Sequence, residues 1–420
     1  MPDLGKPAPL RILAARPRRP LCRPAALLCL WLFPEIAVLA QTTIHVPTDQ
    51  PTIQAGINAS NNGDTVLVAP GTYSEAIDFK GKAITVESSG GPATTIIDGT
   101  NQAFVVTFQS GETRNSILSG FTIQNGGKPF SAFETNDNIS YETTGGIKIQ
   151  NYSQPTITGN IITNNGCSAI FSADGSPLIQ NNEISYNLYP AAPSGQYPCA
   201  YLYAQYLFAE SPIYLMVSYT DTTAAPIPAV ISGNTIENNS FSSTGSLNGT
   251  VNVQLDIAGN TSIDFNGQGV YYVIENNVIR NNVHSDIQNF LTEGGGMYVA
   301  APGIIDQNLI YGNQADEGAG LLFTGPGFWN NGNPSPTLYY DPSLVWFVNN
   351  LVGYNIGSVG DSQIEVDFPS LVEFANNVVI GNSSLPAVWV SQSFQANAIF
   401  DHNDIYNPDG PGLHRRRSHG

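Results

Sequence analysis

The sequence has few charged residues and very few basic ones. Asp, Glu, Lys and Arg make up 11% of its 420 residues, with 15 Lys and Arg against 33 Asp and Glu. Hydrophobic residues reach 41%, which is too many for a disordered chain. A net charge of −18 repels polyanions unless cations intervene, and we therefore expect no nucleic-acid partner.

Cysteine is also scarce. Two of the four cysteines lie in the first 40 residues, and no Cys/His cluster has the spacing of a zinc site. The remaining two, Cys167 and Cys199, could form one disulfide in an oxidising compartment, which would pin a loop onto the scaffold. We expect no metal site of this kind.

A long uninterrupted apolar run is missing as well. The most apolar region, residues 25–40, follows five arginines and is broken by Pro34 and Glu35. Small residues at its end fit a cleavage site before Gln41. We predict that residues 1–40 are a signal peptide, that the mature protein is secreted or at the cell surface, and that it does not insert into a membrane. An uncleaved membrane anchor is the alternative.

Cleavage at this point would make the acidic excess larger. The mature chain would keep 31 acidic and nine basic residues, a net charge of about −22. Three of these basic residues lie in a C-terminal tail, residues 408–420, which we predict to be disordered.

The sequence repeats one motif many times, Asn-x-Ile/Val-x-x-Asn. It begins at Asn160, Asn182, Asn234, Asn277, Asn308, Asn350 and Asn377, with weaker forms at 120–125 and 403–407. Short β-rich segments lie between the copies, and a repeat along most of the chain argues for one elongated domain of stacked strands. Asn tolerates left-handed backbone geometry and can bond to its equivalent one coil away, and we assign these residues to corners of the coil rather than to catalysis.

The spacing of the repeat indicates how many residues each coil contains. Successive copies are 22, 52, 43, 31, 42, 27 and 26 residues apart, and one rung of three short strands needs about 20–25. The intervals of 42 and 43 are two coils or one coil with a long loop. The interval of 52 is one coil plus a long loop insertion at 188–230, which we call the excursion. Any function should lie near such overlong intervals.

We predict that residues 42–75 form an N-terminal cap. Thr43–Val46 is a predicted strand, Ile53 and Ile57 lie four apart as in a short amphipathic helix, and a buried strand follows at 65–69. A helix here would cover the open end of the stacked strands.

Three segments of this cap carry a family resemblance: Pro51-Thr-Ile-Gln-Ala-Gly-Ile57, Gly63-Asp64 and Val68-Ala-Pro-Gly-Thr-Tyr-Ser-Glu75. They resemble the opening of right-handed parallel β-helix proteins of the pectin-lyase-like superfamily, including pectin methylesterases. The Asn repeats resemble the generic β-helix repeats of the same superfamily. The resemblance covers roughly residues 42–407 and implies an all-β fold at 41–407, a single right-handed parallel β-helix with a short N-terminal capping helix and a long aromatic-rich loop.

The catalytic motifs of that superfamily are absent. The Gln-Asp, Asp-Phe-Ile-Phe-Gly and Arg-Pro-Trp motifs of pectin methylesterases do not occur, nor do the Asn-Thr-Asp, Asp-Asp and Gly-His-Gly motifs of polygalacturonases. Pectate lyases need an Arg or Lys base, and after Lys148 the body of the chain offers only Arg280. The family's chemistry therefore does not transfer.

Two matching acidic stretches are the best candidate for catalysis. Glu293-Gly-Gly-Gly-Met-Tyr298 and Glu317-Gly-Ala-Gly-Leu-Leu322 are 24 residues apart, about one coil, with Asp316 beside the second. Rungs stack about 4.8 Å apart, so the two carboxylates should perturb each other's pKa. Retaining glycosidases use a carboxylate pair at about 5–5.5 Å, and the candidate catalytic residues are Glu293, Asp316 and Glu317. Calcium binding and a merely solvated acidic corner are the alternatives.

Several other acidic and aromatic side chains are predicted to have structural positions. Alternation places Glu365 and Asp367 on one strand face, which we interpret as a solvated outer face. Trp346 and Trp389 lie within apolar strands, which favours the core. His284 is the only histidine close in sequence to the candidate carboxylates.

Aromatic side chains stack on pyranose rings, and several lie in the long loops. The candidate substrate-binding residues are Tyr201, Tyr203, Tyr206, Trp329, Tyr339 and Tyr340. The alternative is that the tyrosines pack a small core of the excursion itself.

These observations favour an extracellular, monomeric protein that binds a polysaccharide or cell-surface glycan and cleaves it as a glycosidase or lyase-like enzyme. The rival is a non-catalytic structural or adhesive β-helix of the cell surface. Calcium is the one cofactor left open.

Overall fold

The computed structural model describes residues 41–127, 144–188, 211–218, 227–243, 250–256, 270–286, 292–324, 329–330, 333–334, 343–357, 362–367, 370–382, 386–391, 397–408 and 413–414. Residues 1–40 are a unit separate from residues 41–420. The signal peptide and most of the tail thus lie outside the described residues, and both stay predictions.

Three long sheets make up the fold. Sheet A has the order β1 (Thr43–Val46), β2 (Thr65–Val68), β5 (Thr85–Ser88), β8 (Ile117–Ser119), β11 (Thr156–Thr158), β14 (Leu178–Gln180), β17 (Ala229–Ser232), β21 (Tyr272–Glu275), β25 (Gly303–Asp306), β30 (Ser343–Val348), β33 (Ser370–Ala375) and β36 (Asn397–Asp401). Sheet B has the order β3 (Gly71–Tyr73), β6 (Thr95–Asp98), β9 (Thr122–Gln124), β12 (Ile161–Thr163), β15 (Glu183–Ser185), β18 (Thr235–Glu237), β22 (Val278–Arg280), β26 (Leu309–Tyr311), β31 (Leu351–Gly353), β34 (Val378–Ile380) and β37 (Asp404–Tyr406).

Sheet C has the order β4 (Ile77–Asp78), β7 (Phe104–Phe108), β10 (Gly145–Ile149), β13 (Ser168–Ala173), β16 (Ile213–Ser218), β20 (Val251–Asp256), β24 (Met297–Ala300), β27 (Leu321–Phe323), β32 (Ile364–Val366), β35 (Val388–Val390) and β38 (Leu413–His414). Two small additions are the parallel pair β19 (Ser240–Ser243) and β23 (Val283–Asp286), and the antiparallel pair β28 (Trp329–Asn330) and β29 (Asn333–Pro334).

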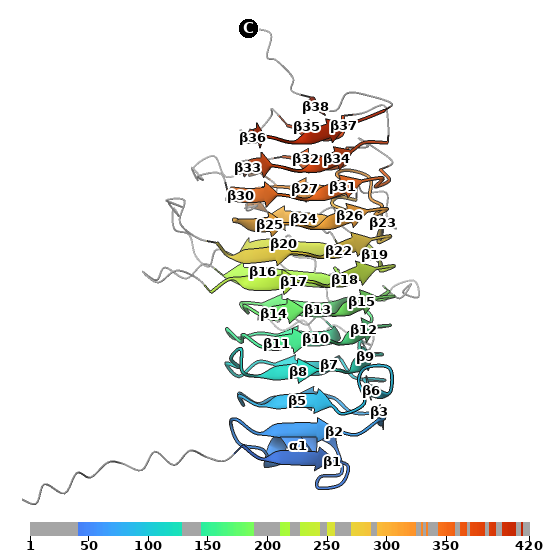
Figure 1. The fold of residues 1–420 in the computed structure, drawn as a ribbon, viewed down its shortest axis with the longest axis vertical. Helices are drawn as coiled ribbons and strands as arrows, with labels where there is room; N and C mark the ends of the chain where they lie inside the picture. Colours follow the sequence, from blue (N-terminus) through green and yellow to red (C-terminus); the bar gives the residue numbers. More distant parts are fainter. Residues whose placement is uncertain are drawn as a thin grey trace, which may run out of the picture. The chain divides into compact units, whose positions relative to one another are not determined.

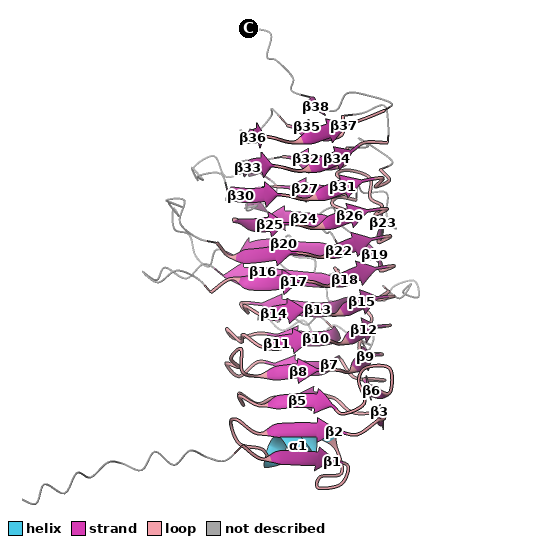
Figure 2. Cartoon of the chain, in the orientation of Figure 1, coloured by secondary structure: helices cyan, strands magenta, loops and turns pink. Residues whose placement is uncertain are grey.

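Each coil of the chain gives one strand to each sheet. Neighbouring strands within sheets A, B and C pair in parallel, and the rungs follow one another from the blue to the red end of Figure 1. Among the described residues the structure has one short helix, α1, and otherwise strands and loops (Figure 2). The chain is a right-handed parallel β-helix, as the sequence predicts. No helix among the described residues is long and apolar enough to cross a membrane.

Two hydrogen-bonded ladders of asparagine hold the rungs in register. In the first, each backbone N–H and side-chain Nδ2 donate to the Oδ1 of the asparagine one rung on, as Asn234 does to Asn277 at 2.9 and 3.0 Å. The first ladder contains Asn160, Asn182, Asn234, Asn277, Asn308, Asn350, Asn377 and Asn403. The second contains Asn165, Asn187, Asn239, Asn282, Asn313 and Asn355.

The ladders settle the ambiguous intervals. Asn182 donates directly to Asn234 at 2.9 Å, and Asn308 to Asn350 at 2.9 Å, so these pairs are one rung apart despite the long chain between them. Every interval in the first ladder is a single coil, and the extra residues lie in loops.

The predicted excursion at 188–230 needs a correction, because part of it belongs to the coil. Strand β16 lies inside this segment and pairs in parallel with β13 and β20 of sheet C. Its strand pattern was hidden among tyrosines and prolines that read as loop. The rest of the segment, 189–210 and 219–226, lies outside the described residues.

The predicted capping helix is α1, Ile53–Ala59. Ile53 and Ile57 are fully buried beneath it, and a Cβ on Gly56 would lie 2.8 Å from Val66 Cγ1, so the helix packs very closely on sheet A. The backbone N–H groups of Ile53 and Gln54 donate to the two carboxylate oxygens of Glu75 at 2.9 and 3.0 Å. The Glu75 segment is thus part of the scaffold.

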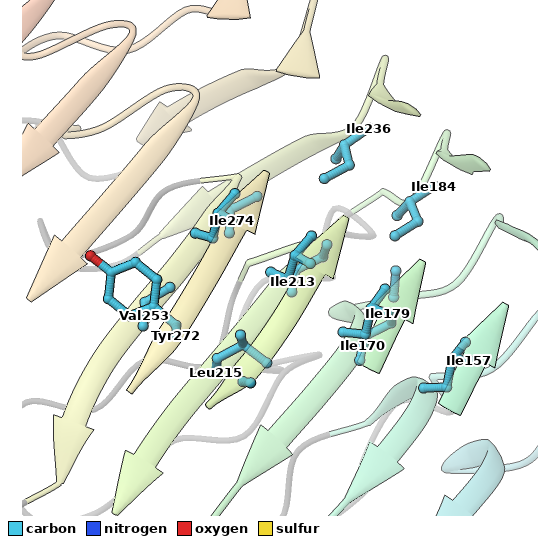
Figure 3. Close-up of a cluster of buried hydrophobic side chains, with 14 of the residues drawn as sticks. Ile157, Ile170, Ile179, Ile184, Ile213, Leu215, Ile236, Val253, Tyr272 and Ile274 are labelled. Carbon is cyan, nitrogen blue, oxygen red and sulfur yellow. The ribbon is translucent and has the colours of Figure 1, made fainter. Parts of the chain in front are cut away.

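Inward-pointing aliphatic residues fill the coil. Figure 3 shows how isoleucines of sheets A, B and C meet inside it, among them Ile179, Ile184 and Ile213, all fully buried. Each such side chain stabilises the fold by about 1.5–3 kcal/mol relative to exposure. Tyr272 fits because its neighbour is Gly303, where a Cβ would lie 2.5 Å from the Tyr272 ring.

Candidate active site

Glu293 and Glu317 lie side by side just before strands β24 and β27 of sheet C. Their backbones form a parallel bridge, and the Gly294 N–H donates to the Glu317 carbonyl oxygen at 3.1 Å. The glycines that follow them, Gly294 and Gly318, adopt φ of +64° and +50°. A Cβ at either position would come within 2.7 Å of a carbonyl oxygen, so both corners need glycine. The predicted stacking of the two motifs is confirmed.

Glu365 and Asp367 approach this pair from the next rung. Glu365 pairs in register with Leu322, and a Cβ on Gly318 would lie 3.3 Å from the Glu365 Cβ. Ile364 and Val366 point inward and are fully buried, so the predicted alternation is confirmed. Glu365 and Asp367 are both half-buried on this outer face, and Glu365 lies beside other carboxyls.

We call these four carboxyls, Glu293, Glu317, Glu365 and Asp367, the acidic cluster, and the pKa values of its three glutamates are raised. Burial and the charges of its neighbours, Glu317 first, raise the pKa of Glu293 to about 8. Burial and the charges of Glu317 and Asp367 raise the pKa of Glu365 to about 8 as well. Burial and the charges of Asp367 and Asp316 also raise the pKa of Glu317. Near neutral pH the cluster therefore contains both protonated acids and carboxylates.

Asp316, the third predicted catalytic residue, has a structural task. Its Oδ2 accepts hydrogen bonds from the Thr292 N–H and Oγ1, both at 2.9 Å, and its own N–H donates to Thr292 Oγ1 at 2.8 Å. This clasp joins the chain just before Glu293 to the chain just before Glu317. Asp316 positions the two glutamates.

His284 is likewise part of the scaffold. It is 2% exposed, its ring stacks on Phe241 with centroids 4.5 Å apart, and its Nδ1 lies 3.1 Å from the carbonyl oxygen of Glu293. The imidazole thus contacts the backbone of the site.

A calcium site would need several oxygen ligands placed together. Within the described ranges, no group of three or more His, Cys, Asp or Glu side chains is placed to hold a metal ion.

Neither candidate lyase base lies at the acidic cluster. Arg280 is engaged on sheet B with Glu237 and donates to the Tyr311 hydroxyl at 2.7 Å. Lys148 lies over the Phe104 ring, with Nζ 5.8 Å from its centroid, six strands before β32 in sheet C. At about 4.8 Å per strand, Lys148 is roughly 29 Å from Glu365 along the sheet.

Both tryptophans assigned to the core are instead on outer faces. Val388 and Val390 point inward, so Trp389 between them points outward, half-buried, one rung beyond Glu365 in register. Trp346 lies outward on sheet A, in register with Glu373. Period-two alternation in each strand was the signal that could have placed them correctly.

Most of the predicted sugar-binding aromatics cannot be placed. Tyr201, Tyr203, Tyr206, Tyr339 and Tyr340 lie outside the described residues, and Trp329 begins strand β28. The aromatic residues that the structure does place on the outer face of sheet C include Phe171 and Tyr214, whose rings stack at 5.5 Å.

Cys167 is disulfide-bonded. The predicted partner, Cys199, lies outside the described residues, and the pairing stays a prediction.

Three solved structures resemble this chain at low sequence identity. An alginate lyase from Paenibacillus sp. str. FPU-7 is 12% identical and has a TM-score of 0.44, covering 86% of this chain and 99% of its own. A pectin methylesterase in complex with a hexasaccharide is 9% identical, with a TM-score of 0.31 over 75% of this chain and 79% of its own. A mannuronic acid specific polysaccharide family 6 lyase from human gut microbiota is 14% identical, with a TM-score of 0.31 over 86% and 87%.

At these TM-scores none of the three bears on the substrate of this chain. No protein-family model and no curated protein matches the sequence.

Proposed function

We propose that the protein is an extracellular glycoside hydrolase that binds a polysaccharide on the outer face of sheet C and cleaves it with retention of configuration. The observation that carries this proposal is the backbone bridge between Glu293 and Glu317. It sets the backbones of the two glutamates one strand spacing apart, about 4.8 Å, which allows their carboxyls the separation of about 5–5.5 Å that retaining enzymes use.

The unequal environments of the two glutamates suggest their roles. Burial and neighbouring carboxylates raise the pKa of Glu293 to about 8, which keeps it protonated at neutral pH, as a general acid requires. Glu317, its partner in the backbone bridge, is the candidate nucleophile. The negative charge of Glu317, the largest electrostatic cause of the raised Glu293 pKa, helps to keep the proton on Glu293.

The reaction would proceed in two steps. Glu317 attacks the anomeric carbon while Glu293 gives its proton to the glycosidic oxygen, so the C–O bond breaks and the leaving sugar departs as an alcohol. Glu293, now a carboxylate, takes a proton from water, which attacks the glycosyl–Glu317 ester and releases the second sugar. Both glutamates return to their starting states.

Two observations support placing this activity outside the cell. The N-terminal segment has the arginine-rich, apolar pattern of a signal peptide, and Cys167 is disulfide-bonded, as is usual in oxidising compartments. The mass of the mature secreted protein would test this, with Gln41 expected as its first residue.

The test of the reaction is release of reducing ends from a panel of polysaccharides. We expect wild type to cleave at least one polymer, and Glu293→Gln and Glu317→Gln to lose at least about 100-fold in kcat because each removes one half of the pair. Glu373→Gln, on the outer face of sheet A, is the matched control and should keep full activity. Binding without any product would favour the non-catalytic adhesive alternative.

A further inference from the structure

Tyr298 lies beside the general acid of the proposed reaction. Met297 and Val299 point into the coil and are buried there, so Tyr298 between them points outward from sheet C. The corner at Gly294 folds back on this strand, and a Cβ at Gly294 would lie 3.2 Å from the Tyr298 Cα. The residue just before this corner is Glu293, so the acid and the tyrosine are neighbours across one tight turn.

The Tyr298 hydroxyl is buried without a bonding partner among the described residues. The side chain is 5% exposed, and its hydroxyl makes no hydrogen bond with any residue that the structure describes. Leu322, its partner in register one rung on, is equally buried and has no polar atom, so packing at this position does not require a hydroxyl. Because a buried hydroxyl without a partner lowers stability, the presence of one here indicates that a ligand completes the bond.

Polar groups of the same kind lie next to it. Within the described ranges, the carboxyl groups of Glu293 and Glu317 make no hydrogen bond either, and the backbone bridge holds the two side by side. Burial, and next the charge of Glu293, raise the pKa of Tyr298 well above its ordinary value. The hydroxyl therefore keeps its proton and remains a donor over the whole range in which Glu293 titrates. A few such polar groups that converge in a largely buried place are typical of a ligand site.

We infer that Tyr298 binds the substrate, with its O–H donating to a hydroxyl oxygen of the sugar unit held between Glu293 and Glu317. The inference rests on the proposed function and specifies how that site selects its sugar, which must carry a hydroxyl group where Tyr298 reaches. A site built to bond a hydroxyl rejects a sugar that lacks it, because the buried group of the protein is then left unpaired. Tyr298 is thus a specificity-determining residue.

Binding measured separately from cleavage tests the inference. Isothermal titration on the background of Glu317→Gln, which should bind without turnover, would use cellopentaose, mannopentaose, xylopentaose and pentagalacturonate as probes. We expect at least one of them to bind, and Tyr298→Phe to weaken that binding about fivefold, the effect of one hydrogen bond.

Tyr272→Phe is the matched control. The Tyr272 hydroxyl is also buried and unbonded in the described part of the chain, but it lies inside the coil, so its removal should leave binding unchanged. Neither change should lower the urea midpoint, because each removes a hydroxyl that the protein does not bond. A lower midpoint for Tyr298→Phe would show that the hydroxyl makes a structural bond and would overturn the inference.

Monodeoxy analogues of the probe that binds most tightly locate the partner hydroxyl. Loss of this one hydroxyl should weaken binding to the protein with Tyr298 about fivefold. It should cause no further loss with Tyr298→Phe, since the same hydrogen bond is already missing. Equal losses with and without the Tyr298 hydroxyl, for every analogue, would contradict the inference.

The possible results separate the two proposals. Binding that Tyr298→Phe leaves intact would overturn the inference even if the wild type cleaves polysaccharide. Binding that depends on the Tyr298 hydroxyl, without product from wild type, would support the inference while the proposed hydrolysis fails. Absence of binding by every probe would contradict both.

Discussion

Adjacent asparagines have different tasks at the corners of this coil. The second residue of an Asn-Asn pair is buried in a ladder, whereas the first takes the left-handed conformation, as in Asn276 with φ of +56° before Asn277. The sequence predicted both properties but assigned them to one residue. Asparagine suits each position for a separate reason: its amide can donate and accept between rungs, and its short side chain tolerates αL geometry.

This division predicts opposite outcomes for neighbouring substitutions. Asn277→Ala removes the acceptor of the Asn234 N–H and the donor to the Ile231 carbonyl, both at 2.9 Å in a buried site. We expect it to lower the free energy of unfolding by roughly 3 kcal/mol. Asn276→Gly should change it by less than about 0.5 kcal/mol, because glycine accepts a positive φ. Urea unfolding of both variants provides the measurement, and equal losses would contradict the assignment.

At the scale of elements, the features that could be predicted are those whose residues recur at a regular spacing in the sequence. The strands, the ladders, the capping helix and the stacking of the two Glu-Gly motifs follow from spacing that can be read along the chain. Strand β16 was missed because a long non-repetitive segment precedes it, and the place of Glu365 was missed because it depends on which strand pairs with β27. Registers across long loops are tertiary facts that local sequence does not encode.

The capping helix offers an element-scale prediction. Glu75→Ala would leave the Ile53 and Gln54 N–H groups without their carboxylate, since both hydrogen bonds end on it. We expect a loss of about 1–2 kcal/mol, within the range known for helix caps, and faster amide exchange across residues 53–59 than across the middle rungs. Unchanged exchange in α1 would show that Glu75 does not hold the cap.

At the scale of the whole molecule, an acidic protein places several of its carboxyls together in partly buried positions. A group whose pKa is raised on folding stabilises the protein below its unfolded pKa, and that stability is lost as pH rises through its folded pKa. For Glu293 and Glu365 the window runs from the ordinary value of 4.5 to about 8. Below this window the trend reverses, since backbone hydrogen bonds from Asn61 and Thr42 lower the pKa of Asp64.

We therefore expect stability to fall between pH 5 and pH 8. After allowance for solvent screening, the loss should be roughly 1–3 kcal/mol. Glu365→Gln should flatten this slope, and Glu373→Gln on sheet A should leave it unchanged. Urea midpoints at four pH values would show this, and a wild-type profile that is flat or rises with pH would contradict the clustering of the carboxyls.

The proposed hydrolysis requires that Glu317 acts as a nucleophile beside a protonated Glu293. The most direct measurement is to incubate the protein with an activated 2-deoxy-2-fluoro glycoside of the sugar it cleaves and to locate the adduct by peptide mass spectrometry. Such a reagent traps the glycosyl–enzyme intermediate of a retaining hydrolase. The account predicts one adduct per chain, on Glu317. An adduct on another residue, or turnover of the parent glycoside with no adduct on the protein, would contradict it.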